Sequence, residues 1–151
     1  MLPTVLFLCS GNYYRSRFAE FYFRHLAARQ RLAWQSDSRG LALDNYNPGH
    51  MSAHTERLCE QMGISTEPLR FPMKLTAQDL NDAAIVIAVK ETEHRPMIRR
   101  QFPDWEDRIE YWEVHDLDVE PASVALPQLV GQVEQLLARL AARDTVPAGE
   151  L

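Results

Sequence analysis

The sequence predicts an α/β fold, a three-layer α/β/α arrangement around a four-stranded parallel sheet. Two short, uninterrupted apolar runs, Val5–Leu8 and Ala84–Val89, are typical of strands buried on both faces. Apolar residues recur at helical spacing between and after these runs, so strands alternate with helices along the chain. This order favours a parallel sheet whose right-handed crossovers place helices on both of its faces.

The first half of the chain opens as strand, tight loop and helix. Turn residues at 10–12 follow the first strand, and an apolar stripe then marks a helix: Ala19, Tyr22, Phe23, Leu26 and Ala27. A weaker strand is expected over Trp34–Ser38, followed by a turn-rich loop over Gly40–Gly49. The next helix is expected over His50–Met62, and Gly63 ends it as a C′ glycine.

The second half repeats the alternation. Thr76 is expected to cap a short helix over Thr76–Ala83, with Asp79 three residues further on. After the strand at Ala84–Val89, a helix is expected over Glu91–Gln101 and an alternating strand over Ile109–Val114. A long closing helix has Pro127 in its first turn and an apolar stripe that runs to Leu140. We therefore expect one domain over residues 1–143 and a tail over 144–151.

Composition limits the classes of protein to which the chain can belong. Its 151 residues are 46% hydrophobic and 25% charged, which is typical of one soluble globular domain. The formal net charge of −5 argues against nucleic acid or an anionic membrane surface as a partner. The amino terminus has no basic segment, and its apolar run is too short for a signal peptide or a membrane span, so a cytoplasmic protein is expected.

The two cysteines, Cys9 and Cys59, stand in different surroundings. A single pair excludes a disulfide framework, and in a reducing cytosol both are expected to be thiols. Cys59 lies beside Leu58 and Met62 on a predicted helix and is expected to be a buried structural thiol. Cys9 instead ends the first strand and begins a C-x5-R-S pattern. We call residues 9–16 the cysteine loop.

The cysteine loop combines the residue types that bind and attack a phosphate monoester. A loop at a helix N-terminus favours a thiolate and offers backbone N–H groups to a dianion. Arg15 can pair with two phosphate oxygens at once, and the Ser16 hydroxyl can both contact the Cys9 thiolate and cap the helix. Gly11 and Asn12 most readily adopt the positive φ that turns successive N–H groups inward. The expected phosphate-binding residues are Ser10, Gly11, Asn12, Tyr13, Tyr14 and Ser16.

The segment Val5–Asn12, followed by Arg15-Ser16 and Ala19-Glu20, resembles the signature of the low-molecular-weight protein tyrosine phosphatase family. Ser38-Arg39-Gly40 is similar to the Ser-Ala-Gly of that family. The resemblance implies that Cys9 attacks phosphorus and that Asp116, placed after the fourth strand, is the general acid. It also implies a phosphocysteine intermediate, with no metal or cofactor, and a phosphorylated protein or small aryl phosphate as substrate.

Three departures from the family pattern stand out. The acid loop reads Asp116-Leu117-Asp118, where family members typically have Asp-Pro-aromatic, and Asp118 competes with Asp116 for the acid role, as do Asp104 and Asp107. Tyr14 stands where many eukaryotic relatives have a second cysteine. The family's histidine that braces the loop asparagine has no clear counterpart, and Arg70 is the nearest candidate.

Other interpretations of the same residues are weighed beside the phosphatase. An arsenate reductase of this fold would need Cys59 or glutathione for its thiol relay, and a sugar-transport phosphocarrier generally lacks the Arg15 equivalent. A non-catalytic phosphate-binding or phosphoprotein-binding module is the third alternative. Among the remaining side chains, the sequence gives no third ligand for a metal at His50 and His54 and favours exposure of His94 and His115. Substrate walls and simple hydrophobic cover are equally good interpretations of Tyr13 and Tyr46.

Overall fold

The computed structural model describes residues 2–44, 46–114 and 122–144, and within them the four predicted strands form one parallel sheet. The strands are β1 (Thr4–Cys9), β2 (Gln35–Gly40), β3 (Ile85–Ala88) and β4 (Glu110–Tyr111), in the order β2-β1-β3-β4. β1 is therefore central, with β2 and β3 as its hydrogen-bonded neighbours. This arrangement confirms the predicted sheet and places Cys9 at the carboxyl edge, where ligands bind in such folds.

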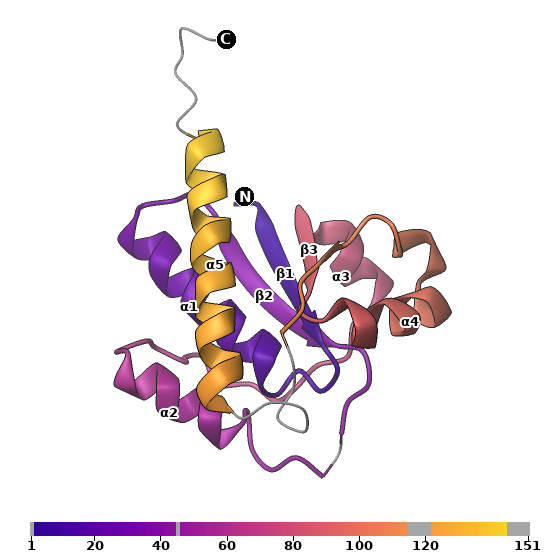
Figure 1. Cartoon of the computed structure of the whole chain (residues 1–151), viewed down its shortest axis with the longest axis horizontal. Coiled ribbons are helices and arrows are strands. Elements are labelled where there is room, and N and C mark those ends of the chain that lie inside the picture. Colours follow the sequence, from indigo (N-terminus) through magenta and orange to yellow (C-terminus); the bar gives the residue numbers. More distant parts are fainter. Residues whose placement is uncertain (1, 45, 115–121, 145–151) are drawn as a thin grey trace, which may run out of the picture.

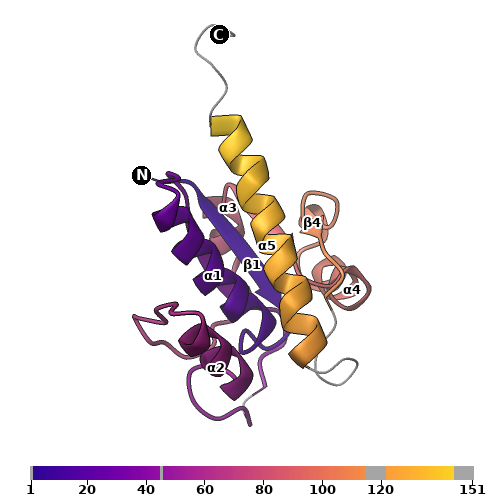
Figure 2. The same cartoon turned by 60° about the vertical axis from the view of Figure 1, so that its left-hand side comes forward.

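Helices cover both faces of the sheet, as predicted. The helices α1 (Arg15–Arg29), α2 (Ala53–Gln61) and α5 (Ala122–Asp144) lie on one side, and α3 (Ala77–Asp82) and α4 (Glu91–Gln101) on the other (Figure 1). In Figure 2, α1 and α5 run side by side in front of β1. A short 3-10 helix, Pro103–Trp105, follows α4.

The side chains of β1 alternate between two hydrophobic clusters. Val5, Phe7 and Cys9 belong to the cluster under α1 and α5, whereas Leu6 and Leu8 belong to the cluster under α3 and α4. The period of two is that of an extended strand, and both clusters are apolar, so the strand is uniformly hydrophobic. β1 is consequently packed against apolar side chains on both faces.

Several element boundaries differ from the sequence-based expectation. The helix α2 begins at Ala53, because Ser52 is its N-cap and accepts a hydrogen bond from the Thr55 amide at 3.0 Å. His50 thus precedes the helix, and it does not share a helical face with His54. The strand β4 is only two residues long, although the Val114 amide still donates to the Val89 carbonyl at 2.7 Å.

The closing helix also begins earlier than predicted. It starts at Ala122, so Pro127 lies in its second turn and not in its first. The predicted apolar stripe begins only at Leu126, so the residues before it gave no helical signal. Two local predictions are confirmed: Thr76 and Asp79 form a reciprocal capping box, and Gly63 has a φ of 69°. Within the described residues, no helix has the length and apolar character that crossing a membrane would require.

Candidate active site

The cysteine loop connects the carboxyl end of β1 to the start of α1. Cys9 is the last residue of β1 and Arg15 the first residue of α1, and both are almost completely buried. A cavity of about 360 Å³ opens at this loop. It is lined by Cys9, Ser10, Gly11, Tyr13, Tyr14, Arg15, Ala42, Asp44, Asn47 and Ser52. The structure therefore brings the cysteine and the arginine of the C-x5-R pattern to one cavity.

Ser16 directs its hydroxyl to the Cys9 sulfur. The Cys9 Sγ and Ser16 Oγ atoms are 2.9 Å apart, and Asn12 Nδ2 donates to the same Oγ at 3.0 Å. Because Ser16 Oγ accepts from Asn12, its own proton is available to the Cys9 sulfur. The expectation that Ser16 also caps α1 is wrong, since Tyr14 is the N-cap residue and no side chain caps the helix.

Asn12 holds the turn of the cysteine loop in a left-handed conformation. Its φ is 50°, whereas Gly11 does not adopt a positive φ, so the left-handed turn expected of both residues occurs only at Asn12. The buried Asn12 amide donates to Ser16 and Ser38 and accepts from Arg70 and the Met73 amide, at 2.9–3.0 Å. All four hydrogen-bonding positions of the side chain are thus occupied.

Gly40 allows β2 to approach the cysteine loop closely. A Cβ atom at this position would lie 2.7 Å from the Ser10 carbonyl oxygen and 3.1 Å from Asn12 Cβ. The Ala42 amide donates to the same Ser10 carbonyl at 2.9 Å. The requirement for glycine at the end of β2 is therefore steric, which the sequence indicated only through the resemblance of Ser38-Arg39-Gly40 to its family counterpart.

Arg70 braces the loop asparagine, as its position suggested. Its Nη1 donates to Asn12 Oδ1 at 2.9 Å and to the Phe71 carbonyl at 3.0 Å. Its Nη2 donates to the carbonyl and hydroxyl oxygens of Ser38 at 2.9 and 3.1 Å. Nη2 also lies 3.4 Å from the buried Glu20 carboxylate, which is paired with Arg17. A guanidinium therefore links the loop, β2 and a buried ion pair.

The first turn of α4 contacts the cysteine loop through Glu93 and His94, which sequence reasoning did not place at the site. Glu93 Oε2 accepts from Arg15 Nη2 at 3.0 Å and from the Ser10 hydroxyl. Burial raises the pKa of Glu93, but hydrogen bonds from His94, Arg15 and Ser10, with the charge of Arg15, outweigh it and hold the pKa well below its ordinary range. The expected exposure of His94 is wrong, because the ring is fully buried against Ser10 and Glu93.

The two loop tyrosines are held from α2. The Ser52 amide donates to the Tyr13 carbonyl at 2.8 Å, and Thr55 Oγ1 donates to the Tyr14 carbonyl at 3.0 Å. The Tyr13 hydroxyl donates to the Pro48 carbonyl at 2.7 Å. Tyr13 also lines the cavity, as one of its two interpretations expected. Tyr46, the other candidate wall, is 94% exposed and does not line the cavity.

The candidate general acids Asp116 and Asp118, with His115, lie outside the described residues. The chain approaches the site just before them, because Arg15 Nη1 donates to the Val114 carbonyl at 3.0 Å. Asp107, a competing carboxylate, pairs instead with Arg95 on the outer surface at 3.1 Å.

Cys59, the second cysteine, belongs to the hydrophobic core under α1 and α5. Cys59 is fully buried, as predicted, and burial raises the pKa of its thiol to about 12. Among the described residues, no group of three potential metal ligands occurs.

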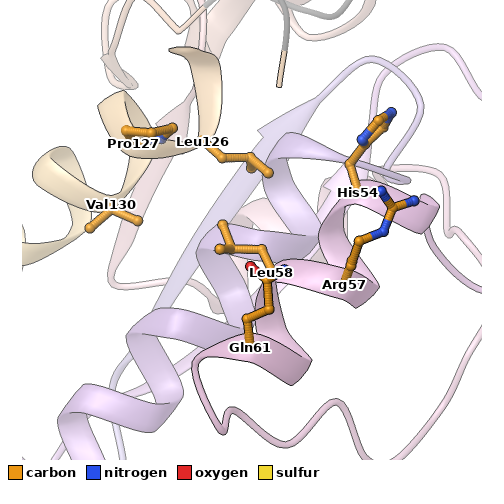
Figure 3. A pocket seen from close by; sticks show the side chains of 7 residues that line it. All are labelled: His54, Arg57, Leu58, Gln61, Leu126, Pro127 and Val130. Atoms are coloured by element: carbon orange, nitrogen blue, oxygen red, sulfur yellow. The ribbon is translucent and has the colours of Figure 1, made fainter. Parts of the chain in front are cut away.

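A larger cavity of about 520 Å³ lies between α2 and α5 (Figure 3), lined by His54, Arg57, Leu58, Gln61, Leu126, Pro127 and Val130. The described residues that line it are mainly apolar, and they include no cysteine or carboxylate.

A thiol at the end of a central parallel strand and an arginine at the start of the following helix define a cysteine-based anion-binding loop on a three-layer α/β/α fold. The chain belongs to the family described as low molecular weight phosphotyrosine protein phosphatase, whose model matches residues 4–142.

Individual relatives agree with this assignment. The chain is 36% identical over 89 residues to YfkJ, a low molecular weight protein-tyrosine-phosphatase of Bacillus subtilis; the match covers 57% of this chain and 55% of YfkJ, about half of that relative. The crystal structure of YfkJ is similar with a TM-score of 0.78 and 25% identity, over 95% of this chain and 97% of that one. A low molecular weight protein tyrosine phosphatase from T. tengcongensis gives a TM-score of 0.77 and 25% identity, over 91% and 99% of the two chains. YwlE, an arginine phosphatase from Geobacillus stearothermophilus, shares the fold with a TM-score of 0.76 and 21% identity, over 95% and 96%.

Proposed function

We propose that the protein is a cysteine-dependent phosphoric monoester hydrolase that acts on phosphotyrosine in phosphorylated proteins. The observation that carries the proposal is the pairing of Cys9 Sγ with Ser16 Oγ at 2.9 Å within the cysteine loop, at the cavity that Arg15 also lines. Membership of the low molecular weight phosphatase family supports the same reaction. Small aryl phosphates are expected to be artificial substrates.

The reaction proceeds in two displacements. The Cys9 thiolate attacks phosphorus while the bond to the leaving oxygen breaks, and Asp116 gives that oxygen a proton. Asp116 then takes a proton from water, which attacks the phosphocysteine, breaks the S–P bond and releases inorganic phosphate. Arg15 and the loop N–H groups bind the phosphoryl oxygens in both steps. The loop residues assigned to binding are Ser10, Gly11, Asn12, Tyr13, Tyr14 and Ser16. The side chains and backbone N–H groups of the chain supply the nucleophile, the acid and the anion-binding groups, so the proposal requires no metal or cofactor.

The arsenate reductase alternative is disfavoured by the second thiol. A relay within the chain would require Cys59 to attack the Cys9 sulfur that carries the arseno group, but Cys59 is fully buried and its pKa is raised to about 12, so only a relay through glutathione would remain. A buried neutral thiol is a poor nucleophile at neutral pH. We also propose that residues 1–143 form the working domain, that 144–151 form a tail, and that the protein is cytoplasmic, where its two free thiols would stay reduced.

Hydrolysis of aryl phosphates in excess chelator tests the proposal. We expect continuous turnover without a thiol reductant as co-substrate, and competitive inhibition by vanadate and phosphate. Cys9→Ser should abolish turnover but retain phosphate binding, and Arg15→Lys should weaken both, because lysine cannot pair with two oxygens. Cys59→Ser is the matched control and should remain active. Phosphate binding without turnover in the unmodified protein would identify a binding module instead.

The choice of phosphorylated residue needs a separate comparison. Peptides that carry phosphotyrosine, phosphoserine or phosphoarginine at one position of a common sequence would be compared by kcat/KM. We expect phosphotyrosine to be preferred; a preference for phosphoarginine would assign the activity named for YwlE.

A further inference from the structure

We infer that Glu93 is a positioning residue: fixed by His94, it orients Arg15 for the transition state of phosphoryl transfer at the expense of phosphate affinity. The inference rests on the proposed function, whose site it deepens. It concerns the first turn of α4, which contributes no residue to the C-x5-R pattern.

Glu93 accepts hydrogen bonds from both ends of the cysteine loop. At the amino end of the loop, the Ser10 hydroxyl donates to Glu93 Oε2. At its carboxyl end, Arg15 Nη2 donates to Oε2 at 3.0 Å, and Nη1 lies 3.4 Å from Oε1. One carboxylate thus connects Ser10 to Arg15, and its side chain is only 25% exposed. Hydrogen bonds to a charged, largely buried acceptor are among the stronger ones in proteins.

His94 fixes the Glu93 carboxylate from behind. The Lys90 amide donates to His94 Nδ1 at 3.1 Å, so Nδ1 is the acceptor and the ring proton is on Nε2. Nε2 lies 3.1 Å from Glu93 Oε2 and 3.2 Å from Ser10 Oγ. Because the backbone of α4 determines this tautomer, the histidine acts as a rigid donor, which is a common way to orient a functional carboxylate.

This arrangement determines which edge of Arg15 can face a phosphoryl group. Nη1 contacts Glu93 Oε1 and donates to the Val114 carbonyl at 3.0 Å. Because both Nη1 hydrogens point to these groups and one Nη2 hydrogen points to Glu93 Oε2, we expect a phosphoryl group to meet the guanidinium on its Nε side. Loss of the carboxylate would remove the contacts of Glu93 with Nη1 and Nη2 that help to orient the guanidinium, while leaving its charge in place.

Glu93 is expected to have opposite effects on two quantities: it lowers the affinity for phosphate and raises kcat. Its negative charge, placed against Arg15, opposes the binding of an anion, so phosphate alone should bind no more weakly without it. The orientation of Arg15 matters most in the transition state, when charge develops on the equatorial oxygens. A positioning role therefore predicts that Glu93→Gln separates kcat from phosphate affinity.

The test compares Glu93→Gln with Glu91→Gln. Glu91 belongs to the same helical turn, but it pairs with Arg95 on the outer surface at 2.9 Å, so its variant makes the same charge change away from the loop. We would measure kcat, KM and the affinities for phosphate and for vanadate, whose adduct resembles the transition state. Glu93→Gln should lower kcat by about 10- to 100-fold, as small misplacements of a catalytic group do. Its phosphate affinity should stay equal or rise, and Glu91→Gln should leave all four quantities unchanged.

A third variant separates charge from geometry. Glu93→Asp keeps the charge but is shorter by one methylene group, so kcat should fall with the thermal midpoint of unfolding nearly unchanged. This variant also provides the test if Glu93→Gln fails to fold.

Four results would overturn the inference. They are an unchanged kcat in the Glu93 variants, equal weakening of phosphate and vanadate binding, the same losses in Glu91→Gln, and full activity of Glu93→Asp. Failure of the proposed function is distinguishable, because the unmodified protein would then not hydrolyse any phosphate ester. In that case the ratio of vanadate to phosphate affinity still decides the matter: it should fall in Glu93→Gln, and an unchanged ratio refutes the positioning role.

Discussion

Replacing Arg70 with methionine removes the cation that joins the cysteine loop to β2 but keeps most of the apolar stem. The substitution deletes hydrogen bonds of 2.9–3.1 Å to Asn12, Phe71 and Ser38, of which Ser38 accepts two. It also removes the longer contacts of 3.4 Å to Glu20 and 3.3 Å to Asp37. Glu20 keeps Arg17 as a partner at 2.9 Å, so no carboxylate is left alone in the interior.

The expected loss of stability follows from these contacts. Four hydrogen bonds at a net ~0.5–1.5 kcal/mol each give ~2–6 kcal/mol. Arg70 is 23% exposed, so water can replace part of what is lost, and we expect the lower end, ~2–3 kcal/mol. For a chain of this size, such a change lowers the thermal midpoint by roughly 5–10 °C. Loss of one of the two donors to Asn12 Oδ1 should also lower kcat by roughly tenfold, equivalent to ~1.4 kcal/mol of barrier.

Urea unfolding and aryl phosphate kinetics on the same preparations would measure both effects. Arg99→Met is the matched control, because Arg99 is 61% exposed and its ion pair with Glu106 lies at the surface. Exposed pairs contribute only ~0–1 kcal/mol. If Arg70→Met loses no more stability than Arg99→Met and keeps its kcat, the brace assigned to Arg70 does not exist.

The other predictions concern the acid and the two thiols. Asp116→Asn should slow hydrolysis of phenyl phosphate much more than that of a nitrophenyl ester, because general acid catalysis, worth roughly 10²–10⁴-fold, matters most for poor leaving groups. Asp118→Asn should change both rates little, and the reverse pattern would assign the role to Asp118. Peroxide should inactivate the enzyme at Cys9 without a disulfide to Cys59, and non-reducing peptide mapping would detect that disulfide if it forms. The Cys59 pKa is raised from 9.0 to about 12, so the folded state keeps the neutral thiol while the unfolded chain ionises. Stability should therefore be unaffected by this group below pH 9.0 and fall as the pH rises toward about 12, a loss that urea unfolding should show and that Cys59→Ala should remove.

Local signals in the sequence sufficed for the sheet and for the core of the site. The apolar run of β1 indicated a strand buried on both faces, and the structure places its side chains in two clusters. The spacing from Cys9 to Ser16 brought the thiol and hydroxyl together, because a strand, a short loop and a helix start are adjacent in the chain. The capping box at Thr76 was visible for the same reason, since it joins residues only three positions apart.

Only the tertiary structure decided which distant residues complete the site. Arg15 and Glu93 are separated by 78 positions in the chain, and they meet because β3 pairs with β1 and brings the first turn of α4 to the cysteine loop. His94 lies in a strongly polar helix, so no apolar stripe predicted that it would be buried. Its ring is buried where Nε2 contacts the Ser10 hydroxyl and the Glu93 carboxylate. Gly40 is required because β2 approaches the loop within a Cβ contact distance. Such contacts depend on strand order and on the packing of whole elements, which the local pattern of a sequence does not contain.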